Sequence, residues 1–213
     1  MEILPSNRRN NLPTSQVNAD GFQVLPAVRQ DTNDPRCKAI VESCGDAAKF
    51  FGFMTPANLD YIAEHRKDAV RKEKSPALVM VMLTYGQQAA EENIKVFVAY
   101  TCIRLGLDWD SFEKSQIAST IANTSEARTL PYVYIVGFFK WLCEGRYPLY
   151  AGKLANVMEA FQCYAKGAIA EVERIREEME RQQREQEWQK HSKECITFEE
   201  FQRRRLNQDK HDT

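Results

Sequence analysis

The stretch PYVYIVGFFKWLCEG, from Pro131 to Gly145, is the most informative part of the sequence for the fold. Apolar residues occupy almost every position from Tyr132 to Cys143, and Lys140 is the one charged residue in that run. Proline is favoured at the first position of a helix and glycine just beyond its last turn. The stretch therefore predicts an apolar helix that packs in a protein core, since it falls short of the roughly 20 apolar residues of a membrane span.

Similar signals divide the preceding part of the chain into further helices. Asp, Thr or Ser followed by Pro recurs as a helix start, and glycine recurs as a helix end. These signals predict helices over residues 35–44, 56–72 and 76–85. The helix formers QQAAEEN favour a further helix over 87–105, although its β-branched residues Val96, Val98 and Ile103 also suit a strand, and Asp110 or Ser111 can cap another helix through about Asn123. Alternating apolar segments joined by Asn-Gly or Asp-Gly do not occur, which argues against a β architecture. We therefore expect an all-α protein, a compact bundle of five or six helices with a long, charged C-terminal helix.

That last helix is predicted from Gly152 to about His191. Proline is absent there, and apolar residues step by three and four positions as far as Met179, after which Gln182 and Gln186 take their place. A helix of about 40 residues is near 60 Å long. We expect its first half to pack on the core and the part beyond Met179 to be solvated or to pair with another chain as a coiled coil.

Three regions follow from these patterns. Residues 1–33 have neither helical nor strand periodicity and are expected to form a flexible arm. Residues 34–170 are the predicted helical core, and 171–213 the extended charged helix with a short terminal helix capped by Thr197 and Glu200. The first residues contain no apolar signal segment, so we expect a cytoplasmic protein without membrane contact. In that compartment the six cysteines are expected to be thiols, with Cys102 and Cys143 buried.

Motifs for enzymatic chemistry are missing from the sequence. Neither of the common glycine-rich phosphate-binding loops occurs, and the metal motifs H-E-x-x-H and C-x-x-C are also absent. His191 and Cys195 are spaced for one helix face, but two ligands do not make a zinc site. We therefore predict no catalytic residues, no cofactor, no metal and no small-molecule substrate, and we expect a protein that is not an enzyme.

Two groups of residues are candidates for binding a partner. The first is the basic segment HRKDAVRKEK over residues 65–74, which has five basic and two acidic residues and includes Arg66, Lys67, Arg71 and Lys72. Such a patch suits phosphate contacts that do not read base sequence. Alternatively, the cations lie at a helix C-terminus, where the helix dipole favours them. The net charge of −1 requires any nucleic-acid contact to be local.

The second group follows the apolar helix and consists of Arg146, Tyr147, Tyr150 and Lys153. Gly145 suits the end of that helix, so a turn is expected here. Arginine beside aromatic rings is typical of protein interface hot spots and of stacking sites for single-stranded nucleic acid. The alternative is that both tyrosines pack back on the core and leave only their hydroxyls at the surface.

The segment from Ser75 to Ile175, with KSPAL…YG and GRYPLYAGKLANVMEAF, resembles a family of uncharacterised helical proteins of roughly 200 residues from Bacteroides-type bacteria. Their genes often lie near phage or mobile-element genes. In that family the turn reads Gly-Arg-Tyr-Gly, and this chain has Pro148 at the last of these positions. The resemblance implies no activity, but it favours a role beside DNA replication or transfer.

Together these patterns favour an accessory protein that binds a protein partner, or a second copy of itself, through the long helix and the Gly-Arg-Tyr turn. The alternative is a weak nucleic-acid-binding protein that uses the basic segment and the same turn.

Overall fold

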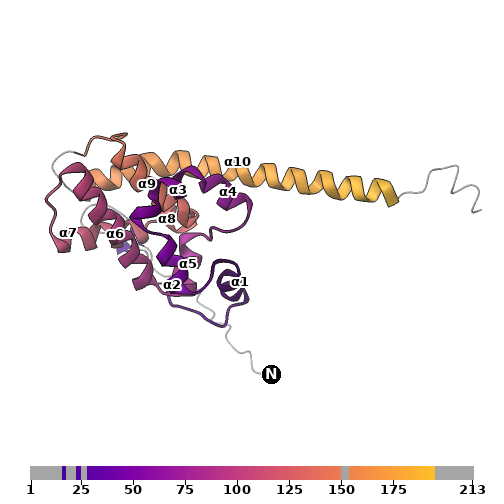
Figure 1. The fold of residues 1–213 in the computed structure, drawn as a ribbon, viewed down its shortest axis with the longest axis horizontal. Helices are drawn as coiled ribbons and strands as arrows, with labels where there is room; N and C mark the ends of the chain where they lie inside the picture. Colours follow the sequence, from indigo (N-terminus) through magenta and orange to yellow (C-terminus); the bar gives the residue numbers. More distant parts are fainter. Residues whose placement is uncertain (1–15, 18–22, 25–27, 150–153, 195–213) are drawn as a thin grey trace, which may run out of the picture. The chain divides into compact units, whose positions relative to one another are not determined.

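The computed structural model describes residues 16–17, 23–24, 28–149 and 154–194, and it confirms an all-α fold (Figure 1). The helices are α1 (Pro35–Cys44), α2 (Ala47–Phe53), the 3₁₀ turn η1 (Pro56–Asn58), α3 (Leu59–Glu64), α4 (Arg66–Arg71), α5 (Leu78–Tyr85), α6 (Gln87–Leu105), α7 (Ser111–Ala122), α8 (Ser125–Thr129), α9 (Tyr132–Cys143) and α10 (Leu154–Glu194). Two-residue strands, β1 (Gln16–Val17) and β2 (Gln23–Val24), pair antiparallel ahead of α1. The expectation that no strand pair with Asn-Gly or Asp-Gly occurs was therefore wrong, because Asp20-Gly21 lies between these two strands in the sequence.

The chain divides into two units, residues 1–172 and residues 173–213. Helix α10 is continuous from the first unit into the second, so the predicted long helix is present as one helix rather than several short ones. Within the second unit, every residue from 180 to 192 is exposed, Trp188 among them. The expected terminal helix with Thr197 and Glu200 lies outside the described residues, as does Cys195.

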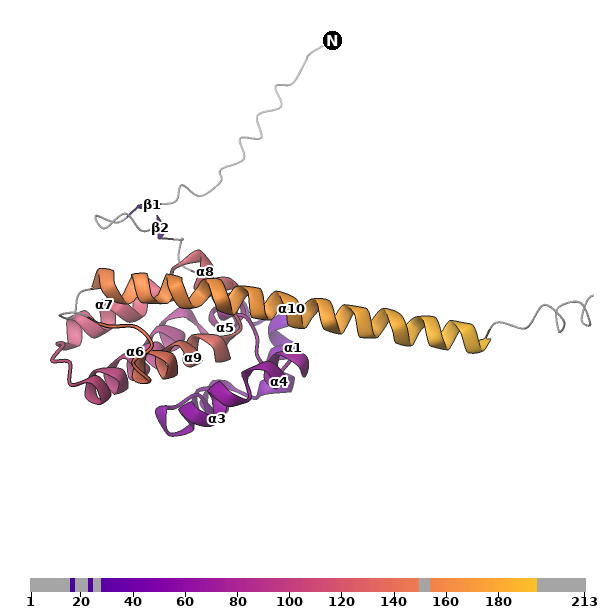
Figure 2. The same cartoon turned by 90° about the horizontal axis from the view of Figure 1, so that it is seen from above.

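Helix α9 is buried on nearly all sides, as its composition predicts. Its residues from Tyr132 to Phe139 are all buried. Helices α3, α4 and α6 pack against it, and its neighbourhood can be followed in Figure 2. Aromatic rings extend this core, because Phe139 stacks on Phe97 of α6 and Phe138 meets Phe161 of α10 edge to face. The core is therefore built around α9.

The prediction of one helix over residues 56–72 was wrong in detail, because the helix is interrupted at His65 and forms the separate helices α3 and α4. His65 has φ −97° and ψ 10°, outside helical values, and it ends one helix and begins the next. The break allows both short helices to pack on α9. The short helices α2 and α8 were missed altogether, so the expected number of five or six helices was too low.

The predicted start at Ser75-Pro76 was also displaced, since α5 begins only at Leu78. Residues Pro76 and Ala77 pair with the segment that enters α9: the Leu78 N–H donates to the Leu130 carbonyl (2.9 Å) and the Tyr132 N–H donates to the Pro76 carbonyl (2.9 Å). The Ser75 hydroxyl accepts from the Val133 N–H at 3.2 Å. Ser75 thus caps α9, a helix distant in sequence.

The last residues of the segment before α1 are hydrogen-bonded to two of the helices. The Asp31 N–H donates to the Leu83 carbonyl at 2.9 Å, and the Val28 N–H donates to Gln87 Oε1 at 2.7 Å. Residues 28–31 are therefore held on α5 and α6, although the sequence placed them in the arm.

The described cysteines are all free thiols, namely Cys37, Cys44, Cys102, Cys143 and Cys163. Cys102 is buried as expected, whereas Cys143 is only half-buried, with its thiol 3.7 Å from Thr101 Oγ1. In the described part of the chain, we find no helix with the length and apolar character needed to cross a membrane.

Candidate functional site

The turn after α9 directs Arg146 back over the end of that helix. Gly145 has φ +68°, its N–H donates to the Leu142 carbonyl (2.9 Å), and the Arg146 N–H donates to the Trp141 carbonyl (3.3 Å). This pair of bonds is the Schellman arrangement, in which the turning residue is left-handed and usually glycine. The prediction that Gly145 ends the helix in a turn is therefore confirmed.

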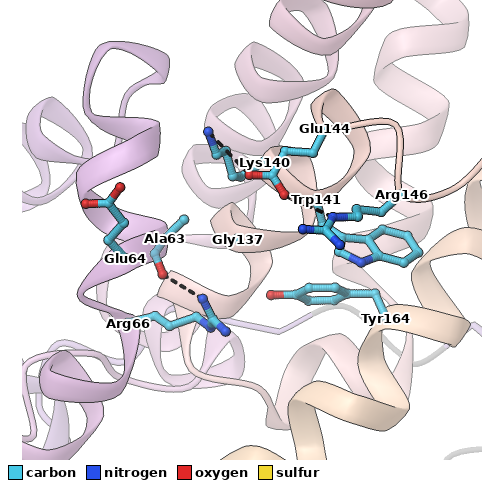
Figure 3. A pocket seen from close by; sticks show the side chains of 9 residues that line it. All are labelled: Ala63, Glu64, Arg66, Gly137, Lys140, Trp141, Glu144, Arg146 and Tyr164. Carbon is cyan, nitrogen blue, oxygen red and sulfur yellow. Dashed lines mark hydrogen bonds and ion pairs between the residues drawn. The ribbon is translucent and has the colours of Figure 1, made fainter.

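A cavity of about 420 Å³ lies beside this turn, and we call it the arginine–aromatic cavity. Its lining comes from α3, α4, α9, the turn and α10: Ala63, Glu64, Arg66, Gly137, Lys140, Trp141, Glu144, Arg146 and Tyr164. Figure 3 shows the Arg66 guanidinium facing the Tyr164 hydroxyl, whereas Arg146 overlaps Trp141 in this view. Two arginines from distant segments thus line one cavity with two aromatic rings.

The cations at the α9 side of the cavity are held by carboxylates. Lys140 forms ion pairs with Asp60 of α3 and with Glu144 (3.5 Å). The hydrogen bond to Asp60 is the main reason that the pKa of Lys140 is raised. Arg146 Nε lies 3.4 Å from Glu144 Oε2, and 66% of the Arg146 side chain is exposed. Arg146 is therefore the more accessible of these two cations.

Arg66, on the opposite side, is half-buried and shares a carboxylate with Lys67. Its Nε lies 3.2 Å from Glu171 Oε2, and Lys67 Nζ lies 2.8 Å from Glu171 Oε1. Burial disfavours the charged forms of both groups, but other interactions outweigh it. The charge of Glu171 raises the pKa of Arg66, and the hydrogen bond from Lys67, together with the charge of Arg66, lowers the pKa of Glu171. Arg66 Nη1 also donates to the Ala63 carbonyl at 2.7 Å. Glu171 thereby fixes Arg66 between α4 and α10.

A second cavity of about 300 Å³ adjoins the first and shares Arg66, Trp141 and Tyr164 with it. Its lining includes Tyr134, whose ring centre lies 5.6 Å from the Arg66 guanidinium carbon. Burial and the nearby Glu171 carboxylate raise the pKa of Tyr134. The Tyr134 hydroxyl lies near the Glu171 carboxylate and helps to lower its pKa. Within the described residues, however, this hydroxyl forms no hydrogen bond of normal geometry.

Gly137 allows the ring of Tyr164 to reach the cavity. A Cβ atom at Gly137 would lie 2.7 Å from the Tyr164 hydroxyl, well inside contact distance. The absence of a side chain at Gly137 therefore lets α10 place the Tyr164 hydroxyl directly on the backbone of α9, where Figure 3 shows it pointing toward Arg66. Burial raises the pKa of Tyr164, so the hydroxyl stays protonated.

The structure separates the basic residues that the sequence grouped together. Arg66 lines the arginine–aromatic cavity and Lys67 shares its carboxylate, but Arg71 pairs with Asp68 (3.5 Å) and Lys72 lines a different cavity. Arg66 and Lys72 therefore line different cavities.

The tyrosines of the turn are only partly described. Tyr147 has its ring centre 6.1 Å from that of Trp141, whereas Tyr150 and Lys153 lie outside the described residues. Sequence reasoning missed Lys140, Trp141, Glu144 and Tyr164 as lining residues. One available signal was Lys140 itself, the single charge within an apolar helix and one helical turn before Glu144.

Comparison with family models, with curated proteins and with solved structures finds no match for this chain. The described residues contain no group of three or more His, Cys, Asp or Glu side chains arranged to hold a metal ion. What the site offers is thus a set of arginines, carboxylates and aromatic rings, which is suited to binding.

Proposed function

We propose that this protein is a helical interaction protein that binds a protein partner through the arginine–aromatic cavity and the adjoining Gly145–Tyr147 turn. The observation that carries the proposal is that Arg66 and Arg146 line one cavity with Trp141 and Tyr164. Tryptophan, tyrosine and arginine are the residues that contribute most to protein–protein binding, and they do so in pockets at the centre of an interface.

The electrostatics favour a protein over nucleic acid as the partner. Each cation of the cavity has a carboxylate within 4 Å, so the lining is mixed in charge rather than basic. A phosphate backbone is bound by clustered lysine and arginine without such neutralisation. A partner with a polar rim and an apolar or acidic side chain for the cavity suits this mixture better.

The long helix is the second element that we assign to partner binding. Its residues 180–192 have only exposed side chains, among them Trp188, which are accessible to a partner or to a second copy of the chain. The association with mobile elements that the sequence resemblance implies stays a prediction.

Photo-crosslinking in cells of the source organism tests the proposal. A photoreactive phenylalanine derivative in place of Tyr147 probes the turn, and the same group in place of Phe112, an exposed residue of α7, is the matched control. We expect a defined crosslinked protein, or a crosslinked dimer of the chain, from position 147 and not from 112. Equal products from both positions would contradict the proposal.

Arg146→Ala then tests whether the arginine contributes. We expect the crosslink from position 147 to weaken about tenfold, as for a hot-spot arginine, while Arg104→Ala, an exposed arginine of α6, leaves it unchanged. Thermal unfolding of both variants should match the parent chain to within about 0.5 kcal/mol. If Arg146→Ala instead abolishes salt-dependent binding of a single-stranded oligonucleotide, the alternative of nucleic-acid binding replaces the proposal.

A further inference from the structure

A separate, larger cavity is lined by other residues of α3 and α4 and differs in chemistry from the first. It encloses about 570 Å³, and its apolar lining consists of Phe50, Phe53, Met54, Tyr61, Ala69 and Val133. Phe50, Met54 and Val133 are almost fully buried and form its floor, whereas 45% of Phe53 and 55% of Tyr61 is exposed at its edge. We call it the apolar cavity.

Lysines form the polar rim of the apolar cavity. Lys49, Lys72 and Lys74 line it, with Asp68 as the carboxylate among the lining residues. Asp68 lies 3.5 Å from Arg71, so its charge is already shared. No ion pair of these three lysines occurs among the residues that the structure describes. The rim therefore carries an excess of positive charge above an apolar floor.

Two backbone features direct these lysines to the rim. Gly45, with φ +90°, lets the Lys49 side chain lie directly on the end of α1, since a Cβ there would be 2.5 Å from Lys49 Cδ. Glu73 has φ +54°, the only positive φ of a non-glycine residue in the described part of the chain. This left-handed residue reverses the chain after α4, and both its neighbours, Lys72 and Lys74, line the cavity. Backbone strain of this kind clusters at binding sites.

We propose that the apolar cavity binds a small amphipathic carboxylate, with an aromatic or medium-chain aliphatic body on Phe50, Met54 and Val133 and its carboxylate at Lys72 and Lys74. The volume falls in the range of about 300–1,000 Å³ that is usual for small-molecule sites. The apolar floor supplies most of the binding free energy, and the rim lysines select the negative charge. A peptide is less suited, because the cavity is bounded by short helices on several sides.

Calorimetric titration with decanoate and with 4-phenylbutyrate tests the charge preference. We expect both to bind, and decyltrimethylammonium, which has a chain of the same length and the opposite charge, to bind at least tenfold more weakly. The double variant Lys72→Gln/Lys74→Gln should weaken decanoate binding about three- to thirtyfold, as two exposed ion pairs contribute. The matched control Lys38→Gln/Lys166→Gln removes two exposed lysines elsewhere and should change nothing.

Cysteine alkylation of the protein without substitutions tests where decanoate binds. Cys44 is half-buried and lines the apolar cavity, whereas Cys163 is exposed and lines the smaller cavity beside Tyr164. Saturating decanoate should slow N-ethylmaleimide labelling of Cys44 at least fivefold and leave Cys163 unchanged, as followed by mass spectrometry of each cysteine peptide. Equal binding of the cationic probe, unchanged binding by the lysine variant, or no protection of Cys44 would each overturn the proposal.

Discussion

Two helices of this protein end in the same left-handed turn, with glycine at the turning residue in one and glutamate in the other. In the turn after α4, the Glu73 N–H donates to the Val70 carbonyl (3.0 Å) and the Lys74 N–H donates to the Ala69 carbonyl (2.9 Å). The corresponding bonds form at Gly145 after α9. Because a Cβ atom makes the left-handed conformation unfavourable by about 1 kcal/mol, Glu73 is strained where Gly145 is not.

Glu73→Gly should therefore stabilise the protein by up to about 1 kcal/mol, and Gly145→Ala should destabilise it by about 1 kcal/mol or more. Urea unfolding monitored by circular dichroism measures both changes. Both substitutions lie just beyond a helix end, so helix propensity does not explain either change. The opposite signs of the two changes therefore report the left-handed backbone. A lower unfolding midpoint for Glu73→Gly would show that the glutamate side chain contributes more than its backbone strain removes.

The residues that line the arginine–aromatic cavity were harder to predict than the turns. Arg66 and Arg146 were both selected, because charge and composition mark them in the sequence. Their common location was not predictable, since Arg66 is held at the cavity by Glu171 of α10, and Lys140 is fixed by Asp60 of α3. The residues around a charged side chain do not indicate which distant residue it will pair with.

At the scale of the elements, α9 and α10 approach each other through a glycine. The Tyr164 hydroxyl occupies the space that a side chain at Gly137 would fill. At Gly167, in the middle of α10, an added Cβ atom would have no other atom within 4 Å, so the lack of a side chain there serves no packing purpose. Gly137 and Gly167 therefore differ in role, although both weaken a helix by their flexibility.

Gly137→Ala should destabilise the protein by about 1–3 kcal/mol, because the added methyl group overpacks the contact with Tyr164. Gly167→Ala should stabilise it by about 0.5–1 kcal/mol through helix propensity alone. Differential scanning calorimetry measures both. Adding Tyr164→Phe to Gly137→Ala removes the clashing oxygen and should recover part of the loss; no recovery would mean that the clash is not with this hydroxyl.

The link between α4 and α10 predicts a dependence of stability on pH. Burial raises the pKa of Glu171, but the hydrogen bond from Lys67 and the charge of Arg66 outweigh it, so the pKa is lowered from the ordinary 4.5. A carboxylate with a lowered pKa stabilises the folded state fully above its unfolded pKa. That contribution is lost as the pH falls from about 5 through the folded-state value.

Glu171→Gln should lower the free energy of unfolding by about 1–3 kcal/mol at pH 7, as expected for hydrogen bonds to charged groups. It should also flatten the loss of stability below about pH 5. Urea midpoints measured from about pH 3 to pH 7 give both quantities. Glu159→Gln, an exposed carboxylate on the same helix, is the control, and an acid-side slope equal to that of the parent chain would contradict the assignment.

The helices themselves were predictable to different degrees. The bounds of α1, α6 and α10 follow from their caps and periodicity, because those signals are local. Helices α2 and α8 are too short for periodicity to mark them, and the start of α5 was misplaced because Pro76 and Ala77 pair with the segment before α9. Tertiary contacts override local signals at these points.

For the whole molecule, the sequence was sufficient for the all-α class and the long final helix, but not for the cavities. The arginine–aromatic cavity and the apolar cavity are each lined by residues from four or more elements, so they form only when the helices pack together. The remaining question at this scale is what the exposed part of α10 contributes.

A chain that ends at Met179 should have the same stability as a chain that ends at Ser192. Residues 180–192 are all exposed, so their removal uncovers little surface that unfolding would otherwise expose. The slope of unfolding free energy against urea concentration scales with that surface, so the slope should not change. The midpoint should then give a free energy of unfolding that is unchanged within about 0.5 kcal/mol. A lower midpoint at every protein concentration would show that this part of α10 stabilises the core. A midpoint that rises with concentration in the longer chain, and not in the shorter one, would assign the exposed part to an interface between two copies.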